Sequence, residues 1–145
     1  MLRLGFLPSD FNPMLLVLGE AQDLRALAGV LRGFARQGGS VALEELAFCA
    51  AWRTRVTLSD TGTNAGTVVA GPLGLHPVDN AEGFVWRLDA ARAAAFAELI
   101  ETLAAPERLA GSEMLECGTD DEIPVKVSRG EYTDDFLGRS AASSA

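Results

Sequence analysis

Cysteine and histidine are scarce in this sequence, with two cysteines and one histidine among 145 residues. Two cysteines do not make a disulfide framework, and their surroundings differ. Cys49 lies inside an apolar run, whereas Cys117 lies between Glu116 and Gly118. We expect reduced thiols and residence in the cytoplasm. The zinc-binding spacings Cys-x-x-Cys and His-x-x-x-His are missing. We therefore expect neither a bound metal nor a cofactor.

Long hydrophobic runs are also missing, and lysine is rare. No apolar run approaches the roughly 18 residues of a membrane-spanning helix, and the run Met14–Leu18 is too short for the core of a signal peptide. Lys126 is the only lysine, whereas there are eleven arginines, and we attribute this preference for arginine to a GC-rich bacterial genome. The net charge of −8 and the pI near 4.6 argue against a nucleic-acid partner. We expect no membrane association.

The acidic charge is concentrated in the last third of the chain. Between Glu107 and Leu137 there are nine acidic and three basic residues, which gives −6 of the total −8. The remaining residues are close to neutral. An acidic region of this density favours association with a basic partner.

Two stretches carry apolar residues at intervals of three and four, which is typical of amphipathic helices. The first covers residues 20–37, with Gly19 as the expected N-cap. The second covers residues 89–105, with Asp89 as the expected N-cap. Its predicted apolar stripe consists of Phe96, Leu99, Ile100 and Leu103.

Apolar or alternating segments elsewhere predict strands. Most connections between them are short enough for hairpins, and only two helices intervene. We therefore expect an α+β domain, with a mainly antiparallel sheet and two amphipathic helices packed on one face, rather than a doubly wound parallel sheet. We place this single domain at residues 1–137 and a flexible tail at 138–145. The expected strands are 2–7, 14–18, 52–58 and 67–70 as a hairpin, 84–88, 113–117 and 123–128.

The triplet Asp60-Thr61-Gly62 resembles the catalytic loop of aspartic proteases, in which two such aspartates share a proton. The resemblance covers three residues, and the flanking Ser59 and Thr63 depart from the usual pattern. Asp, Thr and Gly are also what a hairpin turn requires of its backbone, so we interpret the triplet as a turn.

Other candidate chemistry also has a simpler structural interpretation. His76 has no nucleophile signature near it, and a catalytic pair with Cys49 or Cys117 cannot be inferred from spacing. The runs Asp120-Asp121-Glu122 and Asp134-Asp135 lack the alternating spacing of a calcium loop and predict solvated turns. Gly29-x-x-x-Gly33 lacks the Lys-Ser/Thr of a phosphate-binding loop and predicts close packing of a helix against the sheet.

Two surfaces remain as candidates for partner binding. If both helices cover one side of the sheet, four basic residues converge on its open side, although outward strand positions are commonly polar in any case. The second candidate is the aromatic and acidic segment after the last strand, which alternatively anchors the C-terminus to the core. The basic set is Arg53, Arg55, Arg87 and Lys126, and the acidic set is Glu131, Tyr132, Asp134 and Asp135.

The function that these observations favour is a small non-catalytic domain that binds another protein, of the inhibitor or immunity type, through an acidic surface. Two alternatives remain open. One is a small-ligand binder or enzyme that uses the open sheet face or the His76 loop. The other is a subunit of a structural homo-oligomer.

Overall fold

The computed structural model describes residues 1–8, 13–52, 54–60, 63–64, 67–68, 72–78 and 83–130. Several sequence predictions fall on other residues and lie outside this part of the chain. They concern Arg53, Thr61, Gly62, Glu131, Tyr132, Asp134, Asp135 and the tail 138–145.

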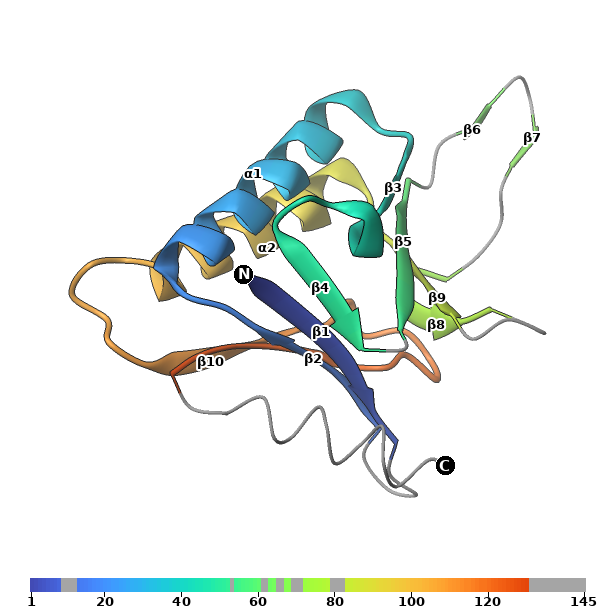
Figure 1. Cartoon of the computed structure of the whole chain (residues 1–145). Helices are drawn as coiled ribbons and strands as arrows, with labels where there is room; N and C mark the ends of the chain where they lie inside the picture. The colour runs from blue at the N-terminus through green and yellow to red at the C-terminus, as the bar shows by residue number, and fades with distance from the viewer. Residues whose placement is uncertain are drawn as a thin grey trace.

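In the part of the chain that the structure describes, the fold is α+β, with two α-helices, a short 3-10 helix at Leu43–Glu45 and two larger sheets (Figure 1). The five-stranded sheet has the order β10-β11-β2-β1-β4, and the four-stranded sheet has the order β3-β5-β9-β8. A separate pair, β6 (Thr63–Asn64) and β7 (Thr67–Val68), forms a small hairpin. The strands of the larger sheets are β1 (Leu2–Leu7), β2 (Met14–Leu18), β3 (Ser40–Ala42), β4 (Cys49–Trp52), β5 (Arg55–Ser59), β8 (Gly74–Pro77), β9 (Gly83–Arg87), β10 (Gly111–Leu115) and β11 (Val125–Arg129).

The expectation of a mainly antiparallel sheet is wrong, because both larger sheets are mixed. β1 pairs in parallel with β4, β2 with β11, and β5 with β9. The β2–β11 register places Leu15 beside Val125, residues that are far apart in the sequence. Alternation along a strand shows which face is buried and carries no information about the direction of a distant neighbour.

The segment 52–58 was expected to form one strand and instead belongs to two sheets. β4 ends at Trp52 and β5 begins at Arg55. Between them, the Thr54 hydroxyl is buried and accepts the backbone N–H of Phe6 at 3.3 Å. Val56 continues the predicted buried face. The chain therefore keeps its alternation while it passes from one sheet to the other.

Helix α1 (Ala21–Gln37) buries the face that its periodicity predicted. Its N-cap is Glu20 rather than Gly19, because the Glu20 N–H donates to Asp23 Oδ2 at 2.9 Å. Gly29 does not pack against the sheet as expected, since a Cβ built there would meet no atom within 4 Å. The buried residues are Asp23, Leu24, Leu27, Ala28, Leu31 and Phe34.

Helix α2 (Ala90–Leu103) begins as predicted, with Asp89 accepting the Arg92 N–H at 2.7 Å. Leu99 is 37 % exposed, so its place in the predicted stripe is wrong. Alanines fill the contact instead, which allows the two helices to lie side by side (Figure 1). The buried residues are Ala93, Phe96, Ala97, Ile100 and Leu103.

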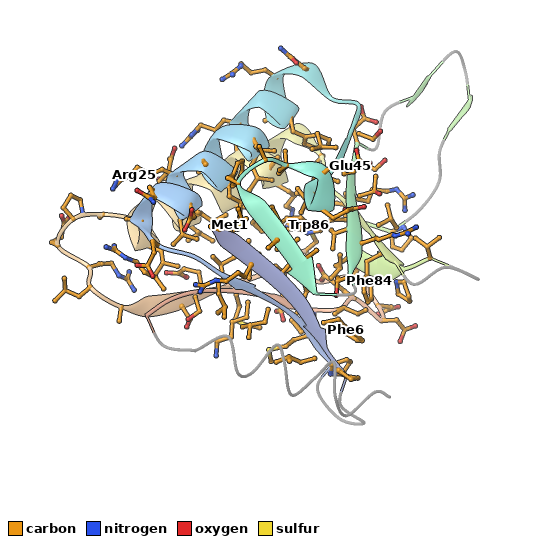
Figure 2. All side chains as sticks on the ribbon, viewed as in Figure 1. Met1, Phe6, Arg25, Glu45, Phe84 and Trp86 are labelled. Atoms are coloured by element: carbon orange, nitrogen blue, oxygen red, sulfur yellow. The ribbon has the colours of Figure 1, made fainter. Side chains whose placement is uncertain are left out.

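One hydrophobic core joins both sheets and both helices. Trp86 on β9 is 1 % exposed, and its ring stacks on Phe96 of α2 with centroids 6.0 Å apart. Phe6 on β1 and Phe84 on β9 bring the two sheets together, with ring centroids 4.8 Å apart (Figure 2). The core fixes how the loops at the sheet borders are placed.

Candidate functional site

The acidic loop, residues 116–122 between β10 and β11, is built around the carboxylate of Glu122. One carboxylate oxygen accepts the Cys117 N–H at 2.7 Å, and the other accepts the N–H groups of Gly118 at 2.7 Å and Thr119 at 3.3 Å. A carboxylate that accepts several backbone N–H groups forms strong, charge-assisted hydrogen bonds. Glu122 therefore fixes the loop, contrary to the expectation that the whole run 120–122 is a solvated turn.

The loop is also attached to β8. The Ile123 N–H donates to the Leu75 carbonyl at 2.8 Å, and the Thr119 hydroxyl donates to the Leu73 carbonyl at 2.6 Å. A Cβ built at Gly74 would collide with the Glu122 carboxylate, and Gly74 also has a φ of +98°. Only glycine fits both demands, so this residue lets the loop approach the strand.

Three carboxylates of the loop remain at the surface: Glu116, Asp120 and Asp121 are exposed. Asp121 occupies the left-handed region with a φ of 61°, at a turn closed by the Glu122 N–H and the Thr119 carbonyl at 3.4 Å. Of the four acidic residues of the loop, Glu122 holds the backbone and the other three face solvent. That arrangement presents negative charge in a fixed geometry.

Cys49, Cys117 and His76 are the remaining candidates for catalysis, and their surroundings indicate structural roles. Burial raises the pKa of Cys49 and of Cys117 to about 11, with the nearby carboxylates of Glu44 and Glu122 adding to it respectively. Both cysteines are free thiols and are protonated at neutral pH, which makes them poor nucleophiles. His76 Nε2 lies 3.0 Å from the Leu73 carbonyl and 3.2 Å from Thr119 Oγ1.

Asp60, the first residue of the Asp-Thr-Gly triplet, is bonded to the turn after α1. Its Oδ2 accepts the Gly39 N–H at 2.6 Å, and its own N–H donates to the Gly39 carbonyl at 3.0 Å. Asp60, His76 and Cys49 therefore lie on different elements, each with its own neighbours. These contacts place Asp60 at the end of β5, beside the turn after α1.

The structure divides the basic residues that were expected to converge. Arg55 and Arg87 belong to the four-stranded sheet, in register with Gly83 and Ser59 respectively. Lys126 belongs to the five-stranded sheet, in register with Leu16. The described basic residues are thus split between two sheets instead of sharing one open face.

Within the described ranges, no group of three or more His, Cys, Asp or Glu side chains could hold a metal ion. None of the helices in that part is long and apolar enough to cross a membrane. Comparison of the chain with protein-family models, with curated proteins and with solved structures gave no match.

The role of Glu122 was not found from the sequence. The nearest signal is Gly118, four residues before it, which has a φ of +82° and so permits the tight turn that aims the N–H groups at one point. Arg129 was missed in the same way. It donates to the carbonyls of Leu103 and Ala105 at 3.2 and 3.1 Å and so caps the end of α2.

Proposed function

We propose that this protein is a non-catalytic domain that binds a basic partner protein through the acidic loop. The observation that carries the proposal is that the acidic residues of the loop have two different roles. Glu122 and the β8 contacts hold the backbone, while Glu116, Asp120 and Asp121 are exposed. A loop fixed before binding loses little conformational entropy on association, which favours affinity.

The other acidic and nucleophilic candidates support the same proposal. Asp60 is bonded to the backbone N–H of Gly39, and Glu44 Oε2 accepts the Val56 N–H at 3.1 Å. The raised pKa values of Cys49 and Cys117 keep both thiols protonated at neutral pH. These groups serve the fold, whereas Glu116, Asp120 and Asp121 of the loop are exposed and available for recognition.

Charge at such a surface acts on the rate of encounter and on specificity. A partner of the toxin or enzyme class with a basic surface would be drawn to the loop, and salt would weaken its binding. An inhibitor or immunity role of this kind requires no chemistry in the domain itself.

The test is capture of a partner from the source cell, followed by affinity measurements with matched variants. Glu116→Gln combined with Asp120→Asn removes two charges from the loop, and Glu45→Gln combined with Glu98→Gln removes two exposed charges elsewhere. We expect the loop variant to bind about three- to tenfold more weakly and with a shallower salt dependence. Equal affinity of the two variants would contradict the proposal.

A further inference from the structure

The outer surface of α1 and α2, called the helical face below, carries two rows of opposite charge. The two helices lie side by side (Figure 1). Three arginines of α1 are seven and four residues apart, so they share one side of that helix. The only acidic residue of α1, Asp23, is buried. The acidic residues of α2 are three residues apart and both exposed. The arginine row is Arg25, Arg32 and Arg36, and the acidic row is Glu98 and Glu101.

An ion pair shows that the two rows lie next to each other. The Arg32 Nε–H donates to Glu101 Oε2 at 2.8 Å, and Arg32 Nη2 donates to Glu101 Oε1. Glu101 and, to a smaller extent, Glu98 raise the pKa of Arg32. Arg25 and Arg36 lie on either side of Arg32 along α1 and are exposed. The helical face therefore has a basic half on α1 and an acidic half on α2.

The residues between these charges are small or apolar. A helix side that faces water usually carries charged and polar residues. On α2 this side also carries Ala91, Ala95 and Leu99, all of which are exposed. On α1, Gly29 is exposed, and a Cβ built there would meet no atom within 4 Å. Small side chains of this kind allow another helix to approach closely.

The charge pattern decides which occupant fits the helical face. A second copy that is related by a two-fold axis parallel to the helices would place its α1 over the α2 of the first copy. Each arginine row would then face an acidic row, and the interface would be self-complementary. A two-fold axis across the helices would instead place α1 over α1 and bring arginine opposite arginine, which is unfavourable.

The size of the helical face indicates how strong such an interface is. The face is about 25 Å long and about 20 Å wide, since α1 has 17 residues and two helices lie abreast. Two copies would therefore bury roughly 1,000 Å² in total, which is typical of weak association that depends on concentration.

We infer that the helical face binds a second copy of this chain, with α1 of each copy over α2 of the other. Glu98 of one copy faces Arg25 and Arg36 of the other, while the Arg32–Glu101 pair stays within each chain. The α1 of the second copy also covers part of Leu99. The acidic loop is not part of the helical face, so the inference does not depend on the proposed function.

The experiment measures the mass of the full chain by sedimentation, from about 10 μM to about 1 mM protein at low salt. We expect the mass to rise from 15.3 kDa towards twice this value and to fall again when salt is added, because salt screens exposed charges. Glu98→Arg places arginine over arginine and should weaken dimerisation about tenfold or more. Glu45→Arg is the matched control, since it reverses an exposed carboxylate of the 3-10 helix and should leave dimerisation unchanged.

A mixture of two charge-reversed chains tests the arrangement of the helices. The double variant Arg25→Glu/Arg36→Glu should also fail to dimerise alone, because its α1 would place glutamates over Glu98. Mixed with the Glu98→Arg chain, it should form a heterodimer, because both contacts between the copies are then complementary again. All three positions are exposed, and circular dichroism checks that each variant keeps its helices.

Three results would overturn the inference. A wild-type chain that stays monomeric at every concentration excludes the dimer. A dimer that Glu98→Arg leaves intact uses another surface. A mixture that stays monomeric, although the wild type dimerises, excludes the placement of α1 over α2. The partner of the acidic loop is tested separately, so each of these results leaves the proposed function standing.

Discussion

Replacement of Glu122 by glutamine tests whether this carboxylate holds the acidic loop. Glutamine keeps one oxygen, which can still accept the N–H groups of Gly118 and Thr119. Its amide group then faces the Cys117 N–H, where a carboxylate oxygen now lies at 2.7 Å. A donor left without a partner costs about 1–3 kcal/mol, and replacing charge-assisted bonds by neutral ones adds to this. We expect a loss of about 2 kcal/mol in the free energy of unfolding.

The assay is urea unfolding, combined with the rate at which Cys117 reacts with a thiol reagent. The free energy of unfolding reports the effect of the substitution on the whole fold. The reaction rate of Cys117 reports local opening of the loop. The two measurements together show whether the substitution weakens the whole fold or the loop alone. Glu116→Gln is the matched control, because this neighbouring carboxylate is exposed and its loss should change stability by less than about 0.5 kcal/mol. If Glu122→Gln matches the control in both measurements, the assignment of Glu122 is wrong.

Three further predictions concern Gly29, Arg129 and the two cysteines. Gly29→Ala should stabilise the protein by about 0.5–1 kcal/mol in urea unfolding, because the site is helical and open; destabilisation would contradict this. Arg129→Gln should destabilise it by about 1 kcal/mol, because the end of α2 loses a cationic donor to two carbonyls; an unchanged urea midpoint would count against the cap. At pH 8, Cys49 and Cys117 should alkylate ~100-fold more slowly than a thiol with the ordinary pKa of 9.0, because their pKa is about 11. Since the folded-state pKa lies above the unfolded value, stability should fall as the pH rises from 9 towards 11, and a constant stability there would refute the burial of both thiols.

The helices were predictable because their signal is local. The spacing of apolar residues identifies α1 within a few residues of its bounds, and Asp89 marks the start of α2. The exposure of Leu99 was not predictable, because it depends on how closely α2 approaches α1. The direction of β11 beside β2 depends on a contact between distant segments, which no local pattern encodes.

The site was predictable only in its charge. The concentration of acids in the last third is visible in the composition, and Asp120 and Asp121 are exposed as expected. Glu122 belongs to the same acidic run, yet its role differs because three backbone N–H groups converge on it. That convergence depends on the turn at Gly118 and on the contact with β8, so it becomes visible only in three dimensions.

The most direct test of the central claim is to map the captured partner onto the protein by NMR. The proposed function predicts that the largest amide shifts fall on residues 116–121 and diminish when salt is added. The Glu116→Gln/Asp120→Asn variant should reduce those shifts at equal partner concentration. Shifts confined to the exposed faces of α1 and α2, with the acidic loop unaffected, would contradict the account.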